Sequence, residues 1–229
     1  MLLLLAGTQA ETASAWGSGC LVLKELGRNI DHCYALATWE MTGGSESVRG
    51  AVSNMTTESA SEPEWANAGR LNDELWVTPE ATSGWLESGQ TYGNYYDCCG
   101  QHAFYAWVDT KYHEYLAPCC NPTATNESEI EDPSANGTWC IYWGSYVVQK
   151  CVSGYHAYSA ELQAGVEAAG NTKPVNEASW EVAGVFHDGT WHAWKGAKTA
   201  SHFETTGSEM CVTTNWGSPY AGNGVGWVC

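Results

Sequence analysis

Short segments with the alternation of a β-strand, separated by turn residues, recur along most of this 229-residue chain. Aromatic and threonine-containing runs lie between clusters of glycine, proline, asparagine and serine, and few stretches have the spacing of an amphipathic helix. This pattern is typical of all-β proteins that are built from packed antiparallel sheets. We therefore predict an antiparallel β-sandwich or jelly roll that is long enough for a sizeable core.

The expected elements divide the chain into three parts. Residues 1–15 read as a signal peptide, residues 16–47 as a small N-terminal lobe with a helical turn or short helix within residues 21–26, and residues 48–229 as the β-sandwich with an irregular C-terminal tail. We expect strands at residues 34–41, 48–54, 73–77, 85–92, 103–108, 112–116, 139–143, 147–152, 161–167, 179–187 and 190–194.

The N-terminus and the cysteines both indicate a secreted protein. The apolar run Leu2–Ala6 precedes Ala13-Ser14-Ala15, which is a small-x-small site of the kind that a signal peptidase cleaves. The usual basic region before the apolar run is missing, and we expect the mature chain to begin near Trp16. No stretch of the sequence is long and apolar enough to span a bilayer.

Ten cysteines without a Cys-x-x-Cys zinc spacing favour disulfides and an oxidising compartment. A hairpin centred on Asp109 would bring the two vicinal cysteine pairs together, and a second hairpin around Gly144-Ser145 would join two further cysteines. Spacing does not fix connectivity. The expected partners are Cys20 with Cys33, Cys98 with Cys120, Cys99 with Cys119 and Cys140 with Cys151, while Cys211 and Cys229 anchor the C-terminal tail.

The charge of the chain is strongly negative. Acidic side chains number 26 and basic ones 9, which gives a net charge of −17. Binding to phosphates needs a basic surface, so this balance argues against nucleic acid and anionic membranes as partners. The histidines have no spacing typical of a metal site, and we expect no metal or cofactor.

Two expected strands carry glutamates on a polar face. In the strand at residues 85–92, Glu87 lies between Trp85 and Gly89 on one face. In the strand at residues 161–167, Glu161, Gln163 and Glu167 share the polar face. Carboxylates on the polar faces of two sheet strands are the feature of this chain that most strongly indicates a function. The alternative is that these carboxylates are solvated side chains on the exposed face of an antiparallel sheet.

Aromatic residues near Glu87 are candidates for substrate binding. Trp85, Tyr105 and Trp107 have the parity that could place them on one lined face. Tryptophan and tyrosine rings accept both sugars and peptide side chains. We predict that these three residues, with Gln163 and Glu161, contact the substrate.

Four segments carry a resemblance to a known family: residues 75–77, 85–89, 104–107 and 162–167. Over roughly residues 48–195 the chain resembles concanavalin-like jelly rolls and, among them, the glutamic peptidases of the neprosin and eqolisin type. The resemblance implies that Glu87 and Glu167 are the catalytic pair. One departure is Ala106, which stands where the eqolisins have a glutamate between tyrosine and tryptophan.

The function that the resemblance implies is peptide hydrolysis at acid pH. One carboxylate would activate water, and a second, protonated carboxyl would donate a hydrogen bond to the carbonyl oxygen, which requires two nearby acids of unlike pKa. The same pair could instead cleave glycosidic bonds, with one acid and one nucleophile. A third alternative is a secreted, non-catalytic module that binds glycan or peptide. We expect a monomer whose substrate is an extracellular polypeptide or polysaccharide.

Overall fold

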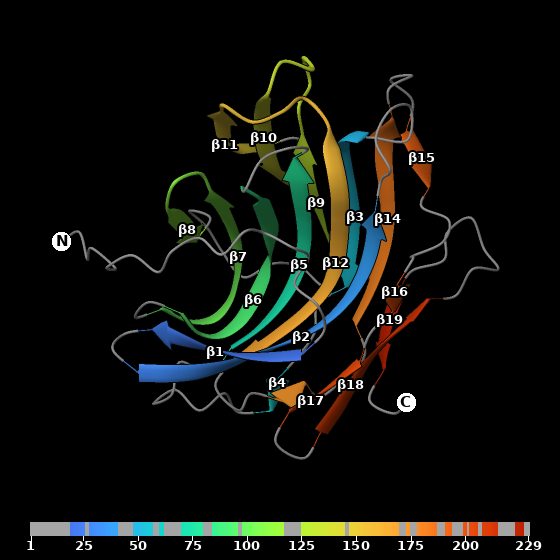
Figure 1. Ribbon diagram of the computed structural model, residues 1–229. Coiled ribbons are helices and arrows are strands. Elements are labelled where there is room, and N and C mark those ends of the chain that lie inside the picture. The colour runs from blue at the N-terminus through green and yellow to red at the C-terminus, as the bar shows by residue number, and fades with distance from the viewer. Residues whose placement is uncertain are drawn as a thin grey trace.

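The structure is a computed structural model, and it is built of β-strands (Figure 1). No helix occurs in the part of the chain that it describes, and hence none that could cross a membrane. The described residues are 19–25, 28–40, 48–56, 60–61, 70–79, 84–95, 98–116, 125–144, 147–169, 173–174, 178–186, 191–193, 199–200, 202–205, 208–214 and 223–226.

The first of two sheets contains the two predicted glutamate strands. Its central strand is β5 (Arg70–Pro79), which pairs with β6 (Leu86–Tyr95) on one side and with β12 (Ser159–Ala169) on the other. All of its pairings are antiparallel. Outside β6 follow β7 (Cys98–Val108) and β8 (Tyr112–Leu116), and outside β12 follows β2 (Arg28–Glu40), which also pairs with β1 (Gly19–Glu25) and β16 (Thr199–Ala200).

The second sheet is antiparallel as well. It runs from β11 (Val147–Ser153) through β10 (Thr138–Trp143), β9 (Thr125–Glu131) and β3 (Val48–Thr56) to β14 (Ala178–Phe186). The strands β15 (Trp191–Ala193) and β19 (Asn223–Gly226) pair with β14, and β18 (Ser208–Thr214) and β17 (His202–Thr205) follow β19. The pairing of Ser159 in β12 with Val48 in β3 joins this sheet to the first, and the short strands β4 (Ala60–Ser61) and β13 (Lys173–Pro174) pair with each other.

The hydrophobic core lies between the two sheets. Alternation along β5 and β12 directs one set of apolar side chains toward the second sheet, which contributes its own set. Burial of one such side chain contributes about 1.5–3 kcal/mol to stability. The fully buried members include Leu75, Val77, Leu86, Leu162 and Val166 from the first sheet and Met55, Ile130, Trp139 and Ile141 from the second.

The predicted antiparallel β-sandwich is confirmed, as are the strands that carry Glu87 and Glu167. One local prediction is wrong: a helical turn was expected within residues 21–26, but residues 21–25 belong to the strand β1, which pairs antiparallel with β2. The strand β2, which belongs to the expected N-terminal lobe, pairs along the length of β12. The expected signal peptide, residues 1–15, lies outside the described residues.

The cysteine predictions have different outcomes. The disulfide between Cys140 and Cys151 is confirmed, and it joins β10 to β11. The hairpin of β7 and β8 is centred on Thr110 rather than on Asp109, because Trp107 pairs with His113, so the register from which the two vicinal pairs were predicted is wrong. The other cysteine side chains, at positions 20, 33, 98, 99, 119, 120, 211 and 229, lie outside the described residues, although the backbones of residues 20 and 33 face each other.

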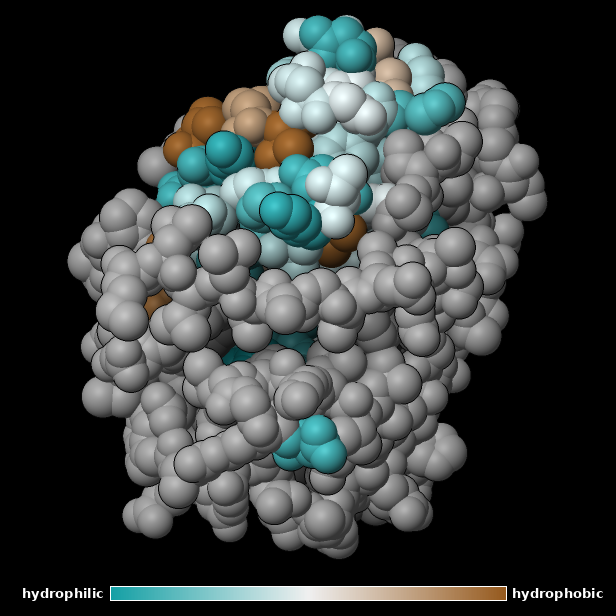
Figure 2. Space-filling view, turned by 60° about the vertical axis from the view of Figure 1, so that its left-hand side comes forward, coloured by the Kyte–Doolittle hydropathy of each residue, from teal (hydrophilic) through white to brown (hydrophobic). Residues whose placement is uncertain are grey.

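The surface of one side of the molecule is shown in Figure 2. Its described part is mostly hydrophilic or neutral, and hydrophobic atoms are confined to small areas. Among the described residues, four large hydrophobic side chains are exposed, and single exposed apolar residues are normal for a soluble surface. They are Tyr112, Tyr115, Val148 and Trp191.

Candidate active site

The face of the first sheet that points away from the core carries a row of acidic side chains. Glu74 lies on the central strand β5, opposite Gly89 of β6 and Gly165 of β12. Glu87 is offset by two residues along β6, and Glu167 is offset by two residues in the other direction along β12. The three side chains therefore share one face and cross it diagonally, with Glu74 in the middle.

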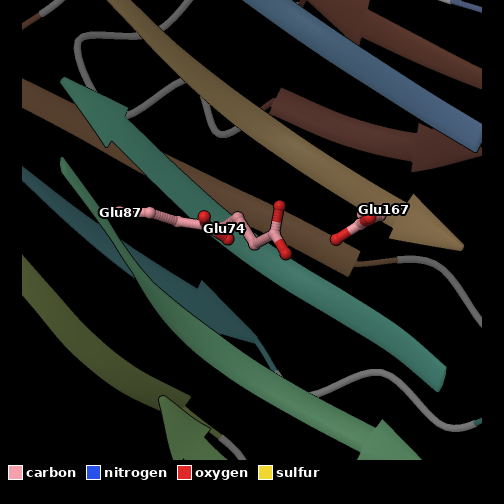
Figure 3. A group of neighbouring side chains, drawn as sticks. All are labelled: Glu74, Glu87 and Glu167. Carbon is pink, nitrogen blue, oxygen red and sulfur yellow. The ribbon is translucent and has the colours of Figure 1, made fainter. Parts of the chain in front are cut away.

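The three carboxyl groups form one cluster. One oxygen from each lies within 4.8 Å of the others, and Figure 3 shows the side chain of Glu74 between those of Glu87 and Glu167. Their exposed fractions are 0% for Glu74, 4% for Glu87 and 7% for Glu167. Like charges in so dry a site disfavour one another, so the carboxyls must divide between protonated and ionised forms.

Glu167 is the ionised member of the cluster. Its Oε1 contacts Nδ1 of His32 from β2, and its Oε2 accepts a hydrogen bond of 2.9 Å from the amide nitrogen of Asn72. Burial by itself raises the pKa of Glu167, but the charge and hydrogen bond of His32 outweigh it, and Arg70 adds to their effect. Together they lower the pKa to about 2.

Glu87 and Glu74 are the protonated members. Burial, together with the charge of Glu167, raises the pKa of Glu87 to about 8, against smaller opposing effects of hydrogen bonds with Glu74 and Trp76. Burial also raises the pKa of Glu74 well above its ordinary value, and the proximity of Glu87 and Glu167 raises it further. Apart from these two glutamates, no described group is a hydrogen-bond partner of either Glu74 oxygen.

The donor set of the cluster suits a hard cation as well as protons. Carboxylate oxygens are the ligands that Ca²⁺ and Mg²⁺ take in proteins, and these three residues could surround such an ion. Both oxygens of Glu167 already accept hydrogen bonds, however, from His32 and Asn72. Protonation of Glu74 and Glu87 reduces the negative charge of the cluster without any ion.

Two of the predicted substrate contacts lie on the same face as the glutamates. Gln163 of β12 is buried beside Trp76, which in turn faces Glu87. Glu161, two residues before Gln163, faces Thr78 and is partly exposed. Trp85, just before β6, is partly exposed, and its ring lies 5.7 Å from that of Tyr112.

The predicted common face for Trp85, Tyr105 and Trp107 is wrong for the last two. Ala106 pairs directly with Glu87, so its two neighbours on β7 point to the opposite face, toward the core. There their rings stack on each other, 6.3 Å apart, and both stack on Tyr115 of β8. These aromatic residues pack on the far side of the sheet from the carboxyl cluster.

Four members of the site were not predicted from the sequence: Glu74, His32, Asn72 and Arg70. A signal for Glu74 was present, since alternation along residues 73–77 puts it on the same face as Trp76. No comparable signal exists for His32. It contacts Glu167 because β2 is the neighbour of β12 in the sheet, and that neighbourhood joins residues 135 positions apart in the sequence.

Fold and site together define an antiparallel β-sandwich with a buried carboxyl cluster on the outer face of one sheet. No protein-family model matches the chain, and no curated protein matches it at a significant level. Solved structures do match. One is a crystal structure of scytalido-glutamic peptidase with a transition state analog inhibitor, at a TM-score of 0.60 and 9% identity, covering 85% of this chain and 98% of that one.

A second match is the same peptidase with a peptide-based transition state analog, at a TM-score of 0.58 and 9% identity. A third is SCP-B, a member of the Eqolisin family of peptidases, in a complex with the tripeptide Ala-Ile-His, at a TM-score of 0.57 and 9% identity. Both alignments cover 85% of this chain and 98% of the other. At this identity the likeness shows the fold, which is the β-sandwich of these glutamic peptidases.

Proposed function

We propose that this protein is a peptidase that hydrolyses peptide bonds in acid solution, with Glu87 as the acid and Glu167 as the base. The observation that carries the proposal is the division of charge within one cluster. Burial beside a negative neighbour raises the pKa of Glu87 to about 8, so this carboxyl is protonated in acid solution. His32 lowers the pKa of Glu167 to about 2, so this carboxyl is ionised there. Pairs of acids with pKa values pushed apart are the usual mark of acid–base assignments in enzymes.

The proposed reaction needs only water and the substrate. The carboxylate of Glu167 accepts a proton from a water molecule while the water oxygen bonds to the peptide carbonyl carbon. The carboxyl of Glu87 donates a hydrogen bond to the carbonyl oxygen and stabilises the charge that develops there. When the carbon–nitrogen bond breaks, the proton held by Glu167 passes to the leaving nitrogen, and the products are a carboxylic acid and an amine.

The substrate and the setting belong to the same proposal. A polypeptide substrate is supported by the sandwich neighbours, two of which hold peptide-based ligands by their description. An extracellular setting is supported by the disulfide between Cys140 and Cys151, because such bonds persist in oxidising compartments.

The test is an assay of denatured protein and of a peptide mixture between pH 2 and pH 8. Glu87→Gln and Glu167→Gln should each lower kcat/KM by at least about 100-fold, since general acid–base groups contribute about 10²–10⁴. Glu131→Gln, on the second sheet, is the matched control and should leave the rate unchanged. Full activity of either site variant would reject the pair.

Two further arms distinguish the alternatives. Glu161→Gln alters a partly exposed glutamate on the same face of β12. If this variant loses activity while Glu167→Gln keeps it, the base is Glu161 and the assignment to Glu167 is wrong.

The other functions have readouts of their own. Release of reducing ends from polysaccharides, with loss of that release in Glu87→Gln, would indicate a glycoside hydrolase. Ligand retention that is unchanged in both glutamate variants would indicate a binding module.

A further inference from the structure

The position of Glu74 is unusual for a glutamate. It occupies the middle strand of the first sheet, it is fully buried, and both strand neighbours at its level are glycines, Gly89 and Gly165. Because these neighbours have no side chains, the space above the sheet is shared by the carboxyl of Glu74, the diagonal neighbours Glu87 and Glu167, and the ring of Phe104 next to Gly89. Figure 3 shows the side chains of Glu87 and Glu167 on opposite sides of that of Glu74.

We propose that Glu74 is a positioning residue that holds a shared proton between Glu87 and Glu167 and thereby sets the protonation of both. This inference deepens the proposed function and rests on it for the catalytic meaning of the two neighbours. The proton sharing itself depends only on the three buried carboxyls and on their surroundings, so it can be tested separately.

The charges around Glu74 support this role. Among described residues, the titratable or charged groups on the same face are Glu87 from β6, Glu167 and Glu161 from β12, Arg70 from β5 itself, His32 from β2 and, further along, His102 from β7 and Tyr112 and Glu114 from β8. Arg70 and His32 act on Glu167. Three carboxylates within 4.8 Å would exceed the charge of these two cations, so at least one carboxyl keeps its proton.

The hydrogen-bond partners of the three carboxyls determine which of them donates and which accepts. His32 and Asn72 both donate to Glu167, which makes Glu167 the acceptor end of the row. Glu74 in its protonated form is then the donor available to Glu167, and it can donate to Glu87 instead when Glu87 is ionised. Hydrogen bonds to an ionised group are the strong ones, and in a dry site they reinforce one another.

Two substitutions separate this role from simple packing. Glu74→Gln keeps the shape and an N–H donor but removes the titrating proton, whereas Glu74→Leu removes the donor as well. In Glu74→Leu, Glu167 loses a donor, and the acid limb of the kcat profile should move up by about one to two pH units with little change in KM. In Glu74→Gln the limb should stay in place. Asp73→Asn is the matched control, because Asp73 is a buried acid on the opposite face of the same strand, where Gln90 donates to it.

The direct measurement is a ¹³C NMR titration of glutamate carboxyls in the wild-type protein and in both variants. The wild type should show Glu74 and Glu87 protonated at pH 6, and Glu74→Gln should show only Glu87. Titration of Glu74 near pH 4.5, as in an exposed glutamate, would overturn the inference whatever the activity. The inference would also be overturned if the titration curves of Glu87 and Glu167 were the same in Glu74→Gln as in Glu74→Leu.

Failure of the proposed function has a different signature. If no peptidase activity is found but Glu74 stays protonated at pH 6, the peptidase assignment falls and the proton sharing stands. If the enzyme is active but Glu74 titrates normally, the proton sharing falls and the peptidase assignment stands. Should Glu74→Leu fail to fold, the wild type and Glu74→Gln still decide the outcome by NMR.

Discussion

Glu87 and Glu167 are the same residue type, less than 5 Å apart at their nearest oxygens, yet they have opposite pKa shifts. Both are buried, and burial alone raises the pKa of each. The difference comes from their partners, since Glu167 has His32 at its carboxylate while Glu87 faces the negative charge of Glu167 itself. At the residue scale, the partner of a buried acid decides its role more than its depth does.

The first prediction concerns His32. His32→Asn removes the charge beside Glu167, so the pKa of Glu167 should rise by about one to two units, as expected when an opposite charge at contact distance is lost. The acid limb of the pH–activity profile should move up by the same amount. Asn72→Ala removes a neutral donor and should move the limb less. Equal shifts in the two variants would contradict the assignment of the effect to charge.

At the scale of elements, the alternation of residues predicts strands well but not their register. The β7–β8 hairpin is the clearest case. Its turn is fixed by Asp109, whose Oδ1 accepts hydrogen bonds from the backbone N–H groups of Thr110 and Lys111, and this places the centre at Thr110. The predicted and observed registers differ by two residues along β8. A shift of two residues leaves every side chain on the same face of the sheet, so the hydrophobic pattern cannot distinguish the two registers.

The candidate site shows the same limit. Glu87 and Glu167 could be found from the sequence because each stands on the polar face of a strand. Glu74 and His32 could not be joined to them, since that requires the order of β6, β5, β12 and β2 in the sheet. The order arises from long-range pairing, which local patterns do not encode. The fold class was predictable, and so were two of the three glutamates, but the third glutamate and the residues that contact Glu167 were not.

The second prediction concerns the close approach of β5 and β6. A Cβ atom at Gly89 would lie 2.0 Å from the carbonyl oxygen of Asp73 and 3.0 Å from the ring of Phe104. Gly89→Ala must therefore move backbone and should cost at least about 1–3 kcal/mol, the usual range for overpacking. Gly144→Ala has open space around the new methyl but a φ of +51°, and should cost about 1 kcal/mol. Urea denaturation of both variants measures this, and a smaller loss for Gly89→Ala would contradict it.

At the scale of the whole molecule, stability should depend on pH in two directions. Glu167 has a folded pKa of about 2, below its ordinary 4.5, so its contribution is present above pH 4.5 and is lost as the pH falls toward 2. Glu87, Glu74 and Glu129 have raised folded pKa values, of about 8 for Glu87 and about 7 for Glu129. Their contributions are present below pH 4.5 and are lost as the pH rises.

The third prediction follows from these signs. The free energy of unfolding should be highest near pH 4–5 and should fall toward neutral pH, by up to about 1.4 kcal/mol per pH unit for each such group. The net charge of −17 at pH 7 adds self-repulsion in the same direction. Chemical denaturation from pH 3 to pH 8 measures the profile. Glu87→Gln should flatten its neutral side, and a stability that rises steadily from pH 5 to pH 8 would contradict the raised values.

The buried indole beside the cluster has a practical consequence. Trp76 faces Glu87, and its hydrogen bond stabilises the ionised form of that carboxyl. Indole nitrogen is a donor only, so the bond changes when Glu87 gains or loses its proton. The ultraviolet absorption and emission of Trp76 should therefore follow the charge of Glu87, and the difference between the wild-type and Trp76→Phe spectra would isolate that signal. The molecule thus contains its own optical pH indicator, which can be read without substrate, label or turnover.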